Sequence, residues 1–269
     1  VKYLFERKVC RIRGNLTYIV EEEKPWANPF ERPEGVQPEQ TINTYRYHGI
    51  RELFSHVNYK GEEGKTHKFV PTWLDDAHKR DYALMDFYPE NCPEEVFNTW
   101  RGYAVESIDP SLGEKGSHGK WLELVEVLSG GHSKYILDYY SLLFQQPGRK
   151  PRTCLVFRGK PGCGKGVHLH SLEILMGSDL YFETNKAQQD VFGNHGQAFN
   201  CNKLVVMNEV SMKYTAENTQ LLLGLIADTA GVQINKKGID TYEVRNLAGT
   251  IMLSNDKVVV YVDETDRRY

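Results

Sequence analysis

The sequence predicts an α/β protein whose second half forms a parallel sheet with flanking helices, preceded by a smaller α+β region. Three apolar runs support this prediction: Cys154-Leu155-Val156-Phe157, Leu204-Val205-Val206-Met207 and Thr250-Ile251-Met252-Leu253. None of them alternates with polar residues, which is typical of strands buried on both faces of a parallel sheet. Helical stretches at 167–176 and 215–228 separate the runs, as in a doubly wound sheet.

The composition is that of an ordinary soluble globular protein. The 269 residues are 40 % hydrophobic and 26 % charged, with a formal net charge of -3. A nucleic-acid-binding surface would therefore have to be a local basic patch. Because the chain starts at Val1 and stops at Tyr269, we expect it to be a fragment of a longer protein.

The sequence contains no targeting segment and no cysteine motif. No apolar run approaches the ~18 residues of a membrane span, and there is no signal peptide. The five cysteines form no CxxC pair and no zinc-finger spacing with histidine. We expect reduced thiols in a reducing compartment, without secretion or membrane association.

The first half of the chain predicts a small α+β region over residues 1–110, whose role the sequence does not reveal. Strands at 8–13 and 16–20 around the turn at 13–15 predict a hairpin, and a proline-rich loop follows. Residues 41–56 mix strand-like and helical patterns, and 75–80 predict a short helix.

A linker is predicted at 107–120, because this stretch contains three glycines and a proline. The second domain is expected to span 119–269 and to be truncated at its C-terminal end. Helices are predicted at 121–128 and 133–146, separated by Gly130-Gly131, and the second has apolar residues at a helical period.

A glycine-rich segment follows the first apolar strand and opens a helix. It matches the pattern G-x-x-x-x-G-K in its proper context between strand and helix. Glycines let backbone N–H groups turn toward phosphate oxygens, and the helix N-terminus adds a partial positive charge. Lys165 is expected to reach the β- and γ-phosphates of ATP. The residues expected to bind ATP are Gly159, Lys160, Pro161, Gly162, Cys163, Gly164, Lys165, Gly166 and Val167.

The position after Lys165 departs from the usual pattern. Ser or Thr normally stands there and its hydroxyl holds Mg²⁺, whereas this chain has Gly166. A water can replace that ligand, because bound Mg²⁺ keeps several waters. We interpret Cys163 as a small filler of the loop. The alternative for the whole segment is a glycine-rich turn without a ligand.

Two polar residues end the second apolar strand, in the manner of a Walker B element. Asn208 and Glu209 follow it directly, at the end where open α/β sheets bind ligands. Glu209 is expected to orient and deprotonate the attacking water and to hold Mg²⁺, largely through water. Asn208 stands where Asp is usual, and its neutral amide can hydrogen-bond a metal-bound water without adding charge. A surface acid at a strand end is the alternative for Glu209.

The third strand and the segment before it supply further candidates. Asn255 ends the strand and is the candidate sensor of the γ-phosphate, with a turn residue as the alternative. Upstream, alternating runs flank Asn235-Lys236-Lys237-Gly238, which predicts a β-hairpin with a basic tip. Lys236 and Lys237 could bind a DNA backbone without reading its sequence, although such a tip is often only a solvated turn.

Paired arginines lie a few residues beyond the third strand. Arg267 or Arg268 could act as an arginine finger on the ATP of a neighbouring subunit. An exposed charge pair is the alternative, and the sequence does not choose between the two arginines.

The ordered set of these motifs resembles the superfamily 3 helicases, which have an AAA+-like P-loop NTPase fold. It is most similar to the helicase module of phage-type primase-polymerases and of giant-virus and poxvirus-type primase-helicases. Phe199-Asn200 before the second strand, the Gly-Lys-Gly form of the loop and the segment 98–106 also fit that group. The resemblance is strong over 154–269, moderate from Asn98 and weak before it.

The resemblance implies an ATP-dependent DNA helicase that uses ATP and Mg²⁺ in replication. It implies a homo-oligomeric ring, a hexamer, around single-stranded DNA, with ATP held between subunits and the basic hairpin in the channel. A primase or polymerase domain in the same full-length chain is left open. The implied location is the cytoplasm or nucleus of an infected host cell.

Two other functions compete with this interpretation. One is a P-loop ATPase with another task, such as DNA packaging or protein remodelling, against which the basic hairpin argues. The other is a nucleotide-binding assembly module that no longer hydrolyses ATP, for which Gly166 and Asn208 argue.

Overall fold

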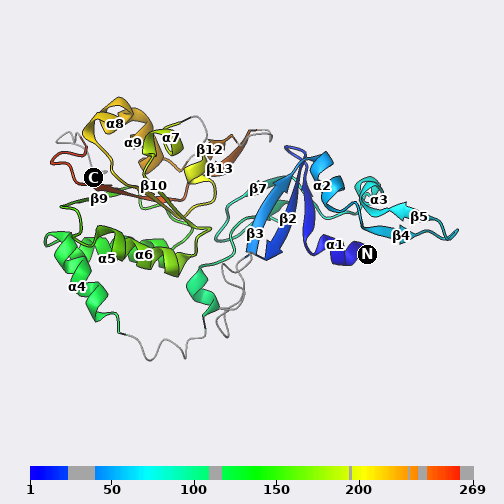
Figure 1. Cartoon of the computed structure of the whole chain (residues 1–269), viewed down its shortest axis with the longest axis horizontal. Coiled ribbons are helices and arrows are strands. Elements are labelled where there is room, and N and C mark those ends of the chain that lie inside the picture. Colours follow the sequence, from blue (N-terminus) through cyan, green and yellow to red (C-terminus); the bar gives the residue numbers. More distant parts are fainter. Residues whose placement is uncertain (24–39, 109–116, 194–195, 230, 236–240, 261–269) are drawn as a thin grey trace. The chain divides into compact units, whose positions relative to one another are not determined.

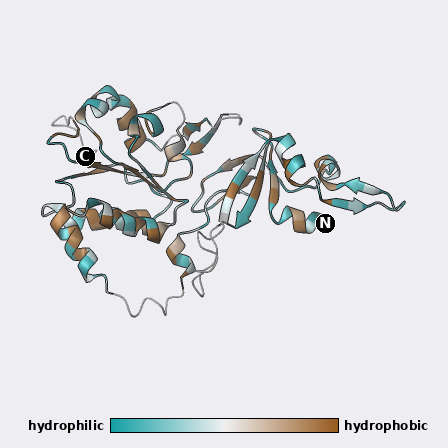
Figure 2. Cartoon of the chain, in the orientation of Figure 1, coloured by the Kyte–Doolittle hydropathy of each residue, from teal (hydrophilic) through white to brown (hydrophobic). Residues whose placement is uncertain are grey.

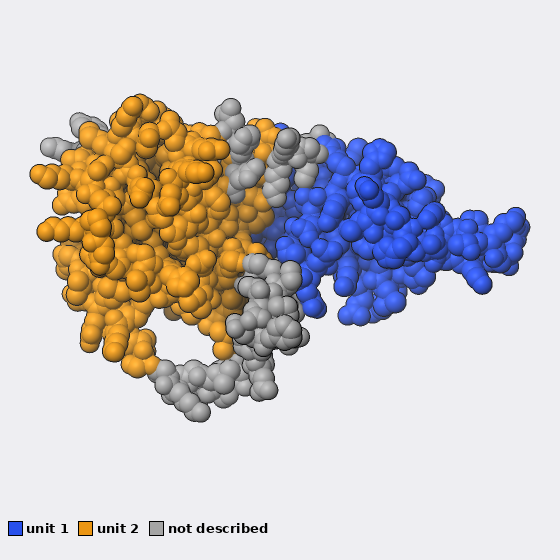
Figure 3. Space-filling view, viewed as in Figure 1, with its two compact units in different colours: residues 1–32, 38–101, 236–242 blue, residues 33–37, 102–235, 243–269 orange. Residues whose placement is uncertain are grey.

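The computed structural model describes residues 1–23, 40–108, 117–193, 196–229, 231–235 and 241–260. The chain divides into two compact units (Figure 3). The first comprises residues 1–32, 38–101 and 236–242, and the second comprises 33–37, 102–235 and 243–269. In the described part of the chain, no helix has both the length and the apolar character needed to cross a membrane.

The first unit is built on a four-stranded sheet in the order β3-β2-β1-β6 (Figure 1). β1 and β2 form the hairpin that the sequence predicts, with Ile12 opposite Thr17, and β3 extends it antiparallel to β2. β6 runs parallel to β1. The elements of this unit are α1 (Lys2–Glu6), β1 (Val9–Ile12), β2 (Thr17–Glu23), β3 (Gln40–Tyr45), α2 (Tyr47–Leu53), β4 (Asn58–Lys60), β5 (Thr66–Lys68), α3 (Phe69–Asp75), β6 (Asp81–Tyr82), β7 (Leu84–Asp86) and β8 (Val96–Asn98).

Aromatic packing holds the helices of the first unit together. Phe5 meets Phe54, Phe69 and Trp73 edge to face, with ring centroids 4.9 to 5.0 Å apart. The Trp73 indole N–H donates to Glu6 at 2.8 Å, so the ring is buried with its polar atom satisfied.

The prediction of a helix at 75–80 is wrong, because the helix lies earlier in the chain, at Phe69–Asp75. Phe69, Val70 and Trp73 supply its buried face, and burial of that face decides where the helix forms. Pro71 is tolerated in the first turn, where its missing N–H would have no partner within the helix. The polar residues that follow form a turn, in which the Asp76 carboxylate accepts a bond from the His78 N–H at 2.8 Å.

The second unit contains a parallel four-stranded sheet in the order β10-β11-β14-β9. Every residue of β11 and β14 is buried, as the apolar runs predict, and Figure 2 shows hydrophobic colouring along these strands. The elements of this unit are η1 (Ala104–Ser107), α4 (Gly119–Ser129), α5 (Ser133–Gln145), β9 (Cys154–Arg158), α6 (Lys165–Met176), β10 (Tyr181–Thr184), α7 (Ala187–Asp190), η3 (Gln197–Phe199), β11 (Leu204–Met207), α8 (Met212–Glu217), α9 (Thr219–Ala227), β12 (Gly231–Ile234), β13 (Tyr242–Arg245) and β14 (Gly249–Ser254).

Helices flank this sheet on both faces. In Figure 1, α4, α5 and α6 lie on one side of it and α7, α8 and α9 on the other. On the α5 side, the Tyr139 hydroxyl accepts a bond from the Thr250 N–H at 2.8 Å and lies 3.1 Å from the Thr250 carbonyl. The second unit is therefore an α/β layered structure, as the sequence predicts.

Three details differ from the sequence prediction. β10 is an additional strand at the edge of the sheet, beside β11. The single helix expected at 215–228 is two helices, because Asn218 lies outside helical geometry between α8 and α9. β12 and β13 pair as the expected hairpin, while its tip with Lys236 and Lys237 falls outside the described residues.

Candidate functional site

The glycine-rich loop connects the end of β9 to the start of α6, and two of its glycines are required by geometry. Gly162 and Gly164 have φ angles of 78° and 97°, which L side chains rarely adopt. A Cβ atom on Gly164 would also lie 2.9 Å from Leu124 of α4. By contrast, a Cβ atom on Gly166 would meet nothing within 4 Å.

The loop leads directly into the N-terminus of α6. Gly164 is the N-cap, and its carbonyl accepts bonds from Val167 and His168 at 3.1 and 3.3 Å. The N–H groups at the start of a helix have no carbonyl ahead of them within the helix, so they suit an anion.

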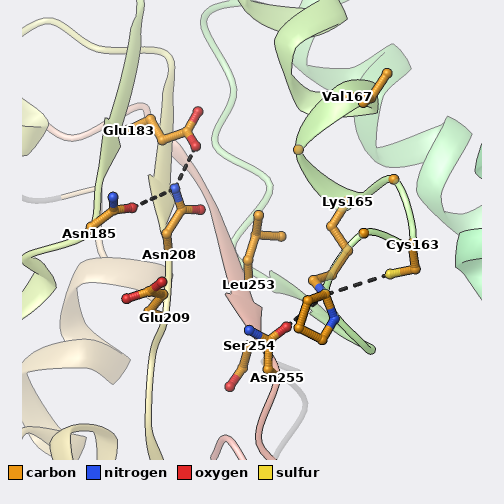
Figure 4. A pocket seen from close by; sticks show the side chains of 14 residues that line it. Cys163, Lys165, Val167, Glu183, Asn185, Asn208, Glu209, Leu253, Ser254 and Asn255 are labelled. Atoms are coloured by element: carbon orange, nitrogen blue, oxygen red, sulfur yellow. Dashed lines mark hydrogen bonds between the residues drawn. The ribbon is translucent and has the colours of Figure 1, made fainter.

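Lys165 is the cation of this loop. Its ammonium group donates to the carbonyls of Gly159 and Lys160 at 2.7 and 3.1 Å. It also lies 3.6 Å from the Cys163 sulfur and donates to Asn255 Oδ1 at 3.0 Å (Figure 4). The loop at β9 is thereby joined to the end of β14, the strand beside it in the sheet.

A buried histidine links the first turn of α6 to α5. His168 Nδ1 is 2.8 Å from the Lys165 carbonyl, and Nε2 is 2.7 Å from the Tyr140 hydroxyl of α5. Burial lowers the pKa of His168, which favours the neutral ring. A carbonyl can only accept, so Nδ1–H donates to Lys165 and Nε2 accepts from Tyr140.

Glu209 follows β11 in a strained backbone conformation. Its φ angle is 54°, in the left-handed region that favours glycine, and its side chain is exposed. Two bonds hold the turn in place. The Val210 N–H donates to the Leu253 carbonyl at 3.2 Å, and the Ser254 hydroxyl donates to the Val210 carbonyl at 2.7 Å. Strain of this kind is common at functional sites.

Asn208 joins the ends of β11 and β10. Its amide nitrogen donates to Glu183 Oε1 at 2.5 Å and to Asn185 Oδ1 at 2.9 Å. Its amide oxygen is buried and has no hydrogen-bond partner among the described residues. A buried acceptor without a donor is costly, so this oxygen suits a donor arriving with a ligand.

These groups line one cavity of about 380 Å³ at the carboxyl ends of the parallel strands. Figure 4 shows Lys165 and Asn255 on one side of it and Asn208, Glu209 and Glu183 on the other. Of the loop, residues 161–167 line the cavity, while Gly159 and Lys160 contribute the carbonyls that hold Lys165. A second cavity of about 230 Å³ shares Asn185, Asn208 and Glu209.

The cavity brings together most of the residues that the sequence predicts for a site. Lys165, Asn208, Glu209 and Asn255 all line it, from three separate strand ends. β14 lies between β9 and β11, so the loop and the acid face each other across one intervening strand. Arg267 and Arg268, like the hairpin lysines, fall outside the described residues.

Three residues here were not predicted from the sequence: Glu183 and Asn185, which line the cavity, and His168, which supports the loop end. Glu183 and Asn185 follow the short apolar run Leu180-Tyr181-Phe182, which was the available signal for β10. His168 gives no sequence signal of its own, because its partner Tyr140 comes from a different helix.

The donor set of the cavity suits an anion together with a hydrated hard cation. The helix N-terminus and Lys165 attract negative charge. Carboxylate and amide oxygens on the other side are the ligands that Mg²⁺ prefers, directly or through water. Among the described residues, no group of three or more His, Cys, Asp or Glu could hold a metal ion alone.

Comparisons with known proteins place the fold but give no activity. Residues 157–268 match the model of a family of unknown function, DUF5906. No curated protein matches. Two solved apo structures of the NrS-1 C terminal region superpose with a TM-score of 0.71, at 18% and 17% identity. The alignments cover 99% of this chain but only 59% of each solved chain.

Proposed function

We propose that this chain is the P-loop ATPase motor of a DNA helicase of the superfamily 3 type. The observation that supports this most strongly is the cavity itself. It unites a glycine-rich loop with Lys165, the acid Glu209 and the polar Asn255, each at the carboxyl end of a different parallel strand. This is the arrangement that a nucleoside triphosphate and an attacking water need.

Each side of the cavity has a separate task in the proposed reaction. The loop N–H groups and Lys165 bind and orient the β- and γ-phosphates of ATP. Glu209 orients the attacking water and accepts its proton, because its exposed carboxylate lines the cavity opposite the loop. Asn255, which accepts a hydrogen bond from Lys165, is proposed to contact the γ-phosphate.

Mg²⁺ fits this site as a largely hydrated ion. It neutralises charge on the transferred phosphoryl group. Gly166 offers no hydroxyl, and the buried oxygen of Asn208 lacks a donor, so water-mediated contact suits both positions. The residues that would hold the hydrated ion are Asn208 and the neighbouring carboxylates.

The DNA-dependent part of the proposal rests on the sequence resemblance. Lys236 and Lys237 are proposed to contact single-stranded DNA at the tip of the β12–β13 hairpin. Arg267 or Arg268 is proposed to complete the site of a neighbouring subunit in a hexameric ring. The DUF5906 match reaches residue 268 and so includes both arginines.

A nucleotide-binding module without hydrolysis is the competing proposal, since Asn208 is neutral and Gly166 lacks a hydroxyl. The position of Glu209 at the cavity, across from the glycine-rich loop, argues for hydrolysis.

Substitution Glu209→Gln distinguishes the two proposals. We expect this variant to bind ATP as well as the wild type does, while its turnover falls by at least ~100-fold, a typical loss for a general base. Phosphate release and equilibrium binding of a fluorescent ATP analogue would be measured on the same samples. Glu217→Gln, on the exposed surface of α8, is the charge-matched control. A wild type that binds ATP but never releases phosphate, with DNA present, would favour the inactive module.

A further inference from the structure

Asn208 leaves the end of β11 without the carboxylate that usually stands beside the general base. Resting on the proposed function, we propose that Glu183 supplies this charge from the neighbouring strand. Its carboxylate contacts the hydrated magnesium of bound ATP and also orients Asn208 toward it. The strand that carries Glu183 is β10, at the edge of the sheet.

Strand register brings Glu183 to this position. β10 pairs with β11 in parallel, with Glu183 opposite Val206 and Thr184 opposite Met207. Glu183 lines the same cavity as Asn208 and Glu209. Figure 4 shows Glu183 beside Asn208, across the cavity from the loop.

Hydrogen bonds fix the orientation of the Asn208 amide. An ionised carboxylate only accepts, so the atom of Asn208 that lies 2.5 Å from Glu183 Oε1 must be the nitrogen. The second hydrogen of this nitrogen goes to Asn185 Oδ1 at 2.9 Å. The amide oxygen therefore points away from Glu183, and in Figure 4 it lies on the side nearer Leu253 and the loop.

This amide oxygen is an acceptor that the described part of the protein leaves without a donor. A water bound to a metal ion is a strong donor and has no need of an acceptor with full charge. Glu183 provides the charge, and Asn208 provides a second, neutral contact. The pair replaces the aspartate that Asn208 does not supply.

The charges around the cavity support the assignment. Among the described residues that line it, the charged side chains are Lys165, Glu183 and Glu209. Lys165 serves the phosphates and Glu209 serves the water, which leaves Glu183 for the cation. The Tyr181 hydroxyl donates to Glu183 Oε2 at 2.6 Å, so both carboxylate oxygens are held in position.

The substitution Glu183→Gln tests the proposal through metal-dependent nucleotide binding rather than turnover. Affinity for a fluorescent ATP analogue would be measured across a Mg²⁺ titration and again in EDTA. We expect the Mg²⁺ needed for half-maximal binding to rise about tenfold, as for loss of one unit charge near a divalent ion in a water-exposed site. Affinity in EDTA should stay equal or improve, because one anion near the triphosphate is gone.

A charge exchange separates this role from simple support of the fold. In the double variant Glu183→Gln with Asn208→Asp, the pair again contains one carboxylate and one amide. We expect it to recover most of the wild-type Mg²⁺ dependence. Glu126→Gln, on the exposed face of α4, is the matched control and should titrate like the wild type.

Two results would overturn the assignment. One is a Glu183→Gln variant with an unchanged Mg²⁺ titration, while Lys165→Ala still loses ATP. The other is an equal loss of affinity with Mg²⁺ and in EDTA that the exchange does not recover, since this indicates a structural role only. In both cases the proposed function survives. A wild type that binds no ATP under any condition would remove the proposed function as well.

Discussion

Glu209 shows how the fold can hold a single residue in a strained backbone conformation. A non-glycine residue in the left-handed region is destabilised by roughly 1–2 kcal/mol, and Glu209 adopts a φ angle of 54° at the end of β11. Hydrogen bonds from Val210 to Leu253 and from Ser254 to Val210 impose this conformation. The fold thus holds Glu209, which lines the cavity, in this conformation at a cost in stability.

Gly166 offers a test of how the metal ion is held. A Cβ atom there meets nothing within 4 Å, so Gly166→Ser should fold without strain. We expect the serine hydroxyl to become a metal ligand and to lower the Mg²⁺ requirement for ATP binding by roughly tenfold, about 1.4 kcal/mol. The measurement is the Mg²⁺ titration of nucleotide binding.

Gly166→Ala is the control, because it adds the Cβ atom without an oxygen. Both variants should stabilise α6 by up to ~1 kcal/mol, since glycine disfavours helices. If serine and alanine give the same Mg²⁺ dependence, the metal ion does not approach position 166.

Two buried lysines join the elements at the base of the sheet, at the opposite strand ends from the cavity. Lys203 precedes β11 and donates to the carbonyls of Arg149 and Leu247 at 2.8 and 3.0 Å. Lys150 precedes β9 and donates to the Leu225 carbonyl of α9 at 2.7 Å. Burial lowers the pKa of each lysine to about 7, and the proximity of Lys203 contributes to the shift at Lys150.

Stability should therefore depend on pH above neutrality. Between pH 7 and about pH 9, each of these two lysines holds its proton more fully in the unfolded chain than in the folded one. Above pH 9 the buried Cys10 and Cys154 thiols act in the opposite direction, because burial raises their pKa values. The free energy of unfolding should then rise by up to ~1.4 kcal/mol per pH unit for each lysine. Urea unfolding at a series of pH values between neutral and about pH 9 measures this slope.

Lys203→Met identifies the source of the slope. The variant will be less stable overall, because two carbonyls lose their donor, but its rise with pH should be about half as steep. A wild-type stability that is flat or falls over this range would show that the two lysines stay protonated in the folded protein.

The strands that the sequence predicts well are those with continuous apolar runs. β9, β11 and β14 were predicted to within a residue or so, because burial on both faces requires apolar side chains throughout. β10 was missed because it is an edge strand, and its Glu183 faces the cavity rather than a core. Glu183 was not predicted as a site residue for the same reason.

Helix boundaries were less predictable than strands. α3 forms where three large apolar side chains are buried, although its neighbours at 76–80 are equally helical in composition. The helices α8 and α9 are separated at Asn218, where no proline or glycine predicts a break. The contact between His168 and Tyr140 depends on packing of α5 against α6, which no local pattern encodes.

At the scale of the whole molecule, the parallel sheet explains why distant motifs form one site. The carboxyl ends of parallel strands lie at the same edge of a sheet. Because the loop, Glu209 and Asn255 each follow such a strand, the sequence was enough to predict that they lie close together. The first unit gave no such motif. Ring assembly, DNA contact and the arginine finger stay predictions.

Equilibrium binding of ATP to Lys165→Ala tests most directly whether the loop binds a triphosphate. Lys165 is expected to make charge-assisted bonds to the phosphates, so affinity should fall by at least ~100-fold, about 2.7 kcal/mol. Lys134→Ala, which removes an exposed cation on α5 outside the cavity, should bind like the wild type. ATP binding that survives unchanged in a folded Lys165→Ala variant would contradict the account.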